Sequence, residues 1–387
     1  NARVTVRTND PTLPFIDVSL SNAAGQEVDT LLQAEDVRWI APRLRDELSN
    51  NNAVGPMQNN SASTNPTGNG AWTPIFNRGL TGSGQVVSIS DSGLDRNEDW
   101  FVDIDFGAGI QRFITPAEAT VPPALGTTHP NAKIYAYWVQ PGATAYDNNQ
   151  TCTSNPTGFH GTHVSGTVAG DRLSTTTPST AARDSGDGMA PGAQILFQDV
   201  GNDTSGCLSI TNFSGTLKQA EDAGAGLHSA SWGNSSAGAY GGNDASADNA
   251  TRIERDLVAV IAAGNAGPGA GSIGSPGVAK NVITVGALGS GNSTTIASFS
   301  SRGPTDDNRI KPDIVAPGSS TVSAAGDTTN GDTVESGVTS SKSGTSMATP
   351  TISGAATLAR QYLMDGFYPR GEITAEDAYR PSGMVMK

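Results

Sequence analysis

The stretch "VVSISDSG" (86–93) is a short apolar run that ends in a carboxylate, Asp91, followed by a serine and a glycine. Similar runs follow along the chain: "KIYAYWV" (133–139), "QILFQDV" (194–200), "LHSASWG" (227–233), "LVAVIAAGN" (257–265) and "NVITVGAL" (281–288). Nearly continuous apolarity over so few residues is typical of strands buried on both faces, as in a parallel sheet. Candidate helices lie between or after these runs, at 160–170, 208–225, 248–257 and 345–364. This alternation predicts an α/β fold with a sheet covered on both sides.

The composition restricts the classes of partner. Acidic side chains outnumber basic ones among the 387 residues, and the net charge is −14. Nucleic acid and anionic lipid are repelled by such a surface, and no stretch approaches the roughly 18 apolar residues of a membrane span. We therefore expect a soluble, secreted monomer without a nucleic-acid or membrane partner.

The N-terminal part of the chain differs from the rest. Residues 1–50 are more polar and more charged, and "SNNNAVGPMQNNSASTNPTGNG" (49–70) has the low complexity of a linker or surface arm. We expect a boundary near residue 50, an arm over 51–84 and the main domain over 85–387.

Functional side chains are expected just after the predicted strands, because ligands of open α/β sheets bind at the carboxyl ends of the strands. Asp91 occupies such a position, although an aspartate before a turn glycine has the same pattern. Two histidines, His160 and His163, are spaced i, i+3 in "GFHGTHVSGTVAG" (158–170). A zinc-peptidase pair needs i, i+4 spacing and an intervening glutamate, so a general base at one of the two is the better interpretation.

A serine and an asparagine complete the set of candidates. Ser346, in "SGTSMATP" (343–350), lies where a loop meets a helix, so its backbone N–H has no acceptor within the helix. Asn265 ends the run in "AAGNAG" (262–267) and offers uncharged donors. Both could stabilise an oxyanion. An N-cap serine and an asparagine in a left-handed turn are the alternatives.

Together, in the order Asp, His, Asn and Ser, these motifs resemble the subtilisin-like serine peptidases, the subtilases. "SDSG", "HGTHVSGTVAG", "AAGNAG" and "GTSMATP" carry the resemblance. "FSSRGPTDDNRIKPDIVAPG" (299–318) is similar to the extended secreted subtilases that have a C-terminal β-sandwich, and "VRWIAPR" (37–43) is similar to the end of their prosegments. The resemblance implies a three-layer fold with a mainly parallel central sheet and helices on both faces. It further implies a prosegment tail over 1–50 and a catalytic domain over 85–387 that is truncated at its C-terminus.

The resemblance also implies a role for each candidate residue. Ser346 is the nucleophile, His160 the general base and Asp91 its orienting carboxylate, while Asn265 and the N–H of Ser346 form the oxyanion hole. The implied substrate-binding residues are Ser231, Trp232, Gly233, Ala263, Gly264 and Gly274. A glycine at 274 implies room for a large apolar or aromatic side chain of a protein or peptide substrate. The implied activity is endopeptidase cleavage, and a catalytically silent or latent binding module is the alternative. An α/β-hydrolase is excluded because the chain has no G-x-S-x-G sequence.

Two departures from the family pattern and two accessory features remain. Phe159 stands where the family most often has glycine, and Thr351 stands where it has histidine. The chemistry requires no cofactor, although structural calcium is common in the family. The five carboxylates of "DRNEDWFVDIDF" (95–106) could hold that ion or could be solvated loop acids. Two cysteines, Cys152 and Cys207, predict a disulfide in a secreted protein, and buried free thiols are the alternative.

Overall fold

The computed structural model describes residues 3–7, 15–19, 51–59, 73–96, 98–101, 103–105, 109–111, 121–144, 158–172, 186–202, 207–291, 293–326 and 339–387. The chain divides into two units, residues 1–47 and residues 48–387. The first contains the antiparallel strands β1 (Arg3–Arg7) and β2 (Phe15–Ser19). The second unit contains every candidate site residue that the structure describes.

A seven-stranded sheet forms the centre of the second unit, in the order β13-β12-β11-β10-β3-β7-β6. All its neighbouring strands are parallel, as expected for apolar runs buried on both faces. The strands are β3 (Val86–Asp91), β6 (Ile134–Val139), β7 (Gln194–Asp199), β10 (Leu227–Ala230), β11 (Val258–Ala262), β12 (Ile283–Leu288) and β13 (Ile314–Pro317).

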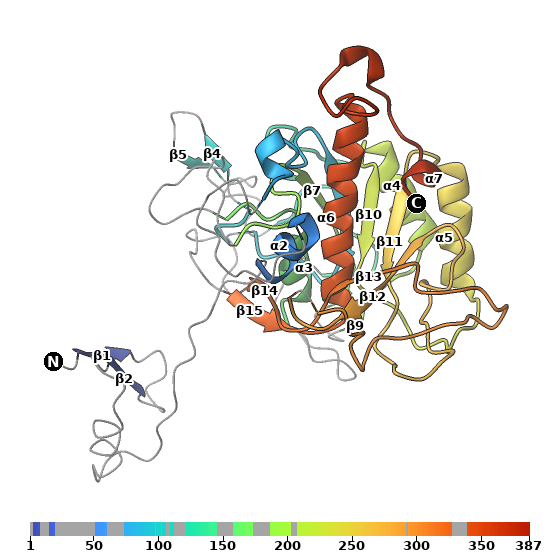
Figure 1. The fold of residues 1–387 in the computed structure, drawn as a ribbon, viewed down its shortest axis with the longest axis horizontal. Coiled ribbons are helices and arrows are strands. Elements are labelled where there is room, and N and C mark those ends of the chain that lie inside the picture. The colour runs from blue at the N-terminus through green and yellow to red at the C-terminus, as the bar shows by residue number, and fades with distance from the viewer. Residues whose placement is uncertain are drawn as a thin grey trace, which may run out of the picture. The chain divides into compact units, whose positions relative to one another are not determined.

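Helices cover both faces of this sheet (Figure 1). On one face, α3 (His160–Ala169) and α6 (Thr345–Met364) pack against each other, and their apolar side chains share a core with Val87 and Ile89 of β3. On the other, α4 (Phe213–Asp222) and α5 (Gly242–Ile253) pack on Ala259 and Ile261 of β11. The side chains of a strand alternate between these two cores, so the structure has the three layers that the sequence predicts.

Smaller elements surround the central layers. Three antiparallel pairs of short strands are β4 (Asp103–Asp105) with β5 (Gly109–Gln111), β8 (Gly201–Asn202) with β9 (Cys207–Leu208), and β14 (Thr321–Ala324) with β15 (Thr339–Lys342). Short helical segments are η1 (Phe76–Arg78), η2 (Ala375–Asp377) and α7 (Gly383–Met386).

Three helices differ from the sequence prediction. The helix expected over 208–225 is shorter, because Leu208 pairs in β9 and α4 begins only at Phe213. Residues expected to belong to an arm form α2 (Asn51–Asn59), because Ala53, Val54 and Met57 give a polar stretch one apolar side that joins the core. The helix expected over 248–257 instead begins at Gly242, where Asp244 accepts a hydrogen bond from the N–H of Gly241 at 2.8 Å. An acidic residue in the first turn is a helix start signal.

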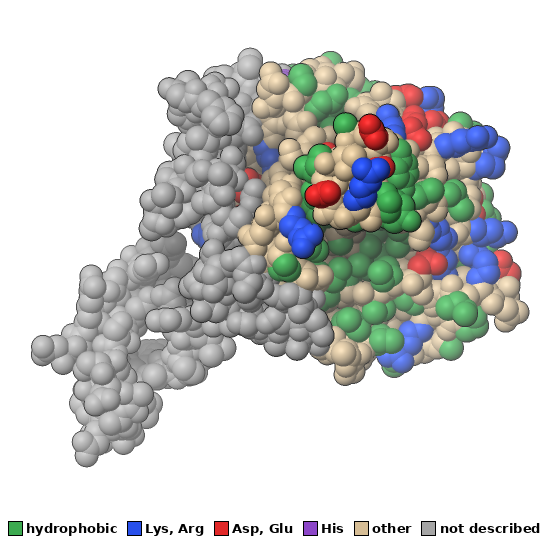
Figure 2. All heavy atoms as spheres, turned by 45° about the horizontal axis from the view of Figure 1, so that its top comes forward, with side chains coloured by type: hydrophobic (Ala, Val, Ile, Leu, Met, Phe, Trp, Pro, Cys, Tyr) green, Lys and Arg blue, Asp and Glu red, His purple; other side chains and the backbone are tan. Residues whose placement is uncertain are grey.

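The surface carries both signs of charge. On the face in Figure 2, lysine and arginine side chains lie scattered among aspartate and glutamate. Exposed apolar side chains in the C-terminal segment include Tyr368, Ile373, Met384 and Val385. Among the residues that the structure describes, no helix combines the length and the apolarity needed to cross a membrane.

Candidate active site

Asp91 and His160 form the most tightly built pair of the site. Asp91 is the last residue of β3 and is 1% exposed, and His160 is the first residue of α3. Nδ1 of His160 lies 2.7 Å from Oδ1 of Asp91, and the same oxygen accepts the N–H of Ser92 at 2.8 Å. Because a carboxylate only accepts hydrogen bonds, the imidazole proton lies on Nδ1. Nε2 of the neutral ring is thereby left as a base.

A glycine allows this close approach. A Cβ on Gly161 would overlap the carbonyl oxygen of Gly93 and lie 3.0 Å from the ring of Phe197. The N–H of Gly161 also donates to Oγ of Ser92 at 3.1 Å. The start of α3 therefore lies directly against the turn that follows β3.

Phe159 has the backbone conformation that favours glycine. Its φ of 53° and ψ of 38° are left-handed, which explains why glycine is common there in the family. Its ring lies against Gly326, where a Cβ would overlap the ring. The other departure, Thr351, is buried and donates to the carbonyl of Met347 within α6 at 3.1 Å.

Ser346 lies in the first turn of α6, and its hydroxyl donates to the carbonyl of Ser231 at 2.7 Å. The helices that carry Ser346 and His160 pack together, and Nζ of Lys342 donates to the carbonyl of Gly158 at 2.7 Å. The segments that precede the two residues are thus linked. The hydrogen bonds of Ser346 and His160 in the described part of the chain do not join the two side chains, and a bond between a nucleophile and its base is often formed only in the substrate complex.

Asn265 is oriented by Thr345, a residue that is not among the sequence-predicted site residues. The N–H and the hydroxyl of Thr345 donate to Oδ1 of Asn265 at 2.9 and 3.1 Å. Since that oxygen is held, Nδ2 is the donor that remains for a ligand. The hydroxyl of Thr345 also accepts the N–H of Gly264 at 3.2 Å. The only sequence signal for this role is that Thr345 directly precedes the candidate nucleophile.

The candidate substrate-binding segments lie beside one another. Asn234, which follows Gly233, forms an antiparallel bridge with Ser275, and the N–H of Gly274 donates to the carbonyl of Ala263 at 2.9 Å. A Cβ on Gly274 would lie 2.5 Å from the carbonyl oxygen of Asn234. Glycine is therefore required here by the approach of two backbone segments, in addition to any room it leaves for a substrate.

The second histidine of the helix has a different environment. His163 is fully buried, and its Nε2 lies 3.1 Å from the carbonyl oxygens of both Thr321 and Ser340. Burial is the main cause that lowers the pKa of His163 to about 3, and repulsion by Lys342 and by the protonated form of His160 acts in the same direction. This neutral histidine links α3 to the paired strands β14 and β15.

The acidic segment and the cysteines are described in part. Asp95, Glu98 and Asp99 are buried, so they are not the solvated acids of the alternative interpretation, and Arg172 lies 3.9 Å from Asp99. Calcium binding by this segment stays a prediction. A second acidic group, Glu221, Asp222 and Glu254, has an exposed member that pairs with Lys218. Cys207 is disulfide-bonded, whereas Cys152 lies outside the described residues, so its pairing with Cys207 also stays a prediction.

Similarity to known proteins agrees with this geometry. The chain is 29% identical to the serine protease/ABC transporter B family protein tagB of Dictyostelium discoideum over 80% of this chain, but it spans only 19% of that protein. It is 30% identical to subtilisin Savinase of Lederbergia lenta, over 74% of this chain and 79% of Savinase.

A solved structure, the CspB protease of Clostridium perfringens, shares the fold with a TM-score of 0.56 at 16% identity, over 81% of this chain and 88% of that one. The model of the subtilase family matches residues 82–375. This match covers most of the chain and includes Asp91, His160, Asn265 and Ser346, and the chain therefore belongs to the subtilase family.

Proposed function

We propose that the protein is a secreted serine endopeptidase whose triad is Asp91, His160 and Ser346. The observation that carries the proposal is the 2.7 Å contact between Nδ1 of His160 and the buried carboxylate of Asp91. It gives the neutral ring the tautomer that a general base needs. Membership in the subtilase family supports the same assignment.

The proposed reaction has two steps. Oγ of Ser346 attacks the scissile carbonyl carbon while Nε2 of His160 takes its proton, and the imidazolium then protonates the leaving amine as the C–N bond breaks. Water attacks the resulting ester with the same base, which releases the acid and restores Ser346. Nδ2 of Asn265 and the N–H of Ser346 donate to the oxyanion formed in each step. No cofactor takes part.

The proposed substrates are proteins or peptides bound as an extended strand between segments 231–233 and 263–265. The contact between Ser231 and Ser346 supports this placement, because it brings one of the two segments to the nucleophile. We expect broad specificity with a preference for large apolar or aromatic residues on the acyl side. A peptide panel in which lysine, arginine or aspartate is preferred there contradicts this expectation.

Secretion, the prosegment assignment of residues 1–50 and a single-chain state belong to the same proposal. A disulfide at Cys207 supports an oxidising compartment. N-terminal sequencing of the protein purified from culture medium tests the first two points, and light scattering tests the third.

Hydrolysis of a fluorogenic peptide library by the wild type and by Ser346→Ala tests the activity. The proposal predicts turnover by the wild type and a loss of at least about ten-thousandfold in the variant. A wild type that folds, binds peptides and does not cleave them would instead establish the silent binding module.

A further inference from the structure

A further buried histidine lies inside the central sheet. His228, on β10, is fully buried and lies between two serines of the neighbouring strand β3. Its Nδ1 is 3.0 Å from Oγ of Ser88, and its Nε2 is 3.0 Å from Oγ of Ser90. Burial lowers the pKa of His228 to about 3, so the ring is neutral at ordinary pH.

The neighbours of the ring determine where its proton lies. The hydroxyl of Ser88 donates to Oε1 of Gln198 at 2.8 Å, so its oxygen must accept the contact with His228. Nδ1 of His228 is therefore the donor, and Nε2 of the neutral ring is an acceptor. It follows that the hydroxyl of Ser90 donates to Nε2 and uses its lone pairs for other donors.

The donor on Ser90 comes from the candidate substrate-binding segment. The indole N–H of Trp232 lies 3.1 Å from Oγ of Ser90 and 3.0 Å from its carbonyl oxygen. Hydrogen bonds therefore run in one direction, from Trp232 to Ser90 to His228. The indole also packs edge-to-face with the ring of Phe213, with centroids 4.9 Å apart.

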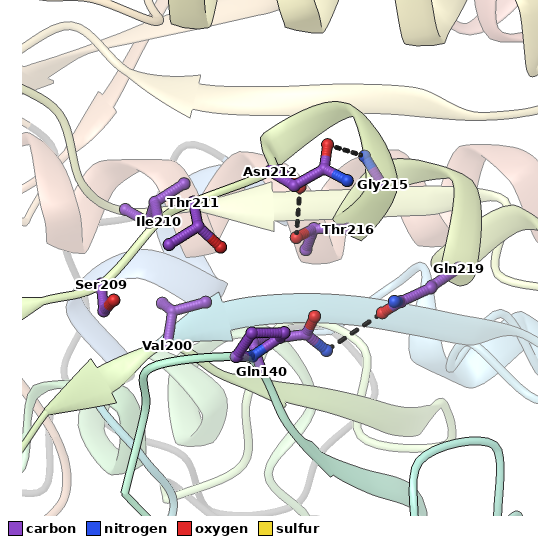
Figure 3. Close-up of a pocket in the computed structure, with 10 residues that line it drawn as sticks. Gln140, Val200, Ser209, Ile210, Thr211, Asn212, Gly215, Thr216 and Gln219 are labelled. Carbon is purple, nitrogen blue, oxygen red and sulfur yellow. Dashed lines mark hydrogen bonds between the residues drawn. The ribbon is translucent and has the colours of Figure 1, made fainter.

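The opposite end of this network is anchored on α4. Nε2 of Gln198 donates to the carbonyl of Thr216 at 3.0 Å and lies 3.2 Å from Oε1 of Gln219, which also accepts from Gln140 at 3.0 Å. Figure 3 shows Gln140 and Gln219 meeting at a small cavity beside the start of α4. Each step of the network has a donor and an acceptor, so His228 has one hydrogen-bonded orientation.

We propose that His228 is a positioning residue for the acyl-side substrate wall, because it fixes Ser90, which in turn fixes the indole of Trp232. The neighbour of Trp232, Ser231, contacts the candidate nucleophile, so the orientation of this segment bears on how a substrate side chain lies beside Ser346. An apolar residue at 228 would leave the Ser90 hydroxyl buried without its acceptor. This inference rests on the proposed function.

Two substitutions of His228 test its two hydrogen bonds, through Nε2 and through Nδ1, one at a time. In His228→Gln the amide oxygen reaches the Nε2 position and still accepts from Ser90. In His228→Asn the amide reaches only the Nδ1 position and still donates to Ser88. We expect His228→Asn and Ser90→Ala to raise KM for peptides with a large apolar acyl-side residue by about three- to tenfold. Their kcat should change less, and His228→Gln should stay within about twofold of the wild type.

The indole N–H gives a readout that does not depend on activity. In protein labelled with ¹⁵N-tryptophan, the Trp232 signal, assigned with Trp232→Phe, should shift and exchange faster in His228→Asn and Ser90→Ala but not in His228→Gln. Trp100 and Trp138, whose indoles donate to the carbonyls of Gly186 and Thr127 at 2.8 Å, are internal references.

Three outcomes are distinguishable. Equal effects of His228→Gln and His228→Asn on KM and on the Trp232 signal would overturn the inference. It would also be overturned if Ser90→Ala had the same Trp232 signal and the same KM as the wild type. If His228→Asn does not fold, Ser90→Ala alone decides between these results. A wild type that cleaves no peptide would refute the proposed function, whereas the Trp232 signal would still show whether His228 positions the indole.

Discussion

Nδ1 of His160, the first residue of helix α3, lies 2.7 Å from Oδ1 of Asp91, the last residue of strand β3. The backbone positions both residues. Asp91 is held by its strand, and His160 is held by a helix whose Gly161 allows close contact with Gly93, in the turn after β3. The pair is therefore formed before any substrate binds.

Removing the charge of Asp91 should impair catalysis much more than folding. Asp91→Asn can donate from its amide to Nδ1 and so favours the wrong tautomer of His160, and kcat should fall by about ten-thousandfold. Asp199→Asn is the matched control, because Asp199 is the register partner of Asp91 on β7 and bonds to Tyr137 and to the N–H of Gly201. It should lower the melting temperature while kcat of the folded protein stays near the wild type. Similar kcat values for the two variants would contradict the assignment.

Asn265 should act on the transition state. In Asn265→Ala we expect kcat to fall by about a hundred- to a thousandfold with KM little changed, because one oxyanion donor is lost. Asn265→Asp keeps an acceptor for Thr345 but replaces the free amide with an acceptor, so it should be at least as impaired. Near-normal turnover in Asn265→Asp would show that the contact with Thr345, rather than donation to the oxyanion, matters.

A methyl group at Gly161 should displace the start of helix α3, which carries His160. Gly161→Ala places a Cβ against the carbonyl of Gly93, so α3 must move and both the melting temperature and kcat should fall. Gly242→Ala, at an open and exposed position at the start of α5, should be neutral or slightly stabilising. Thermal melts and peptide kinetics of the two variants give the comparison, and an unchanged kcat in Gly161→Ala would be the contrary result.

Acid should destabilise the fold partly through His163. The unfolded residue titrates near 6.5, whereas its pKa in the folded protein is lowered to about 3, mainly by burial and further by repulsion from Lys342 and from the protonated form of His160. Between these values the unfolded chain binds a proton that the folded chain does not, so the free energy of unfolding falls as pH decreases from 6.5 towards 3. The full effect is on the order of 3–5 kcal/mol.

Urea titrations between pH 7 and 4 measure this dependence. His163→Gln can still donate to the carbonyls of Thr321 and Ser340 but does not titrate, so its stability should depend less steeply on pH, by about one proton. Equal slopes for the two proteins would exclude His163 as a source of acid sensitivity.

Local sequence signals predicted the elements that carry the site. Helix α6 occupies 345–364, the range expected from the sequence, and the six predicted apolar runs contain strands of the central sheet. Short strands with mixed burial were missed: β13 has exposed Ile314, and β14 and β15 are recognisable only as a pair. Helix α2 was missed because its stability comes from contacts with distant residues rather than from a strong helical pattern.

Contacts between segments that are distant in the sequence could not be predicted from local sequence patterns. The roles of Thr345 and His228 depend on which side chains face them across strands, and neither residue type at its position signals such a partner. The direction of the Ser346 hydroxyl, towards Ser231, is likewise set by tertiary packing.

Covalent labelling with a fluorophosphonate tests the triad most directly, because the probe reacts only with a serine that a base has activated. Peptide mapping of the labelled wild type should place one adduct on Ser346, while His160→Ala and Ser346→Ala should remain unlabelled although they fold. An unlabelled but folded wild type, or equal labelling of His160→Ala and the wild type, would contradict the assignment of the triad.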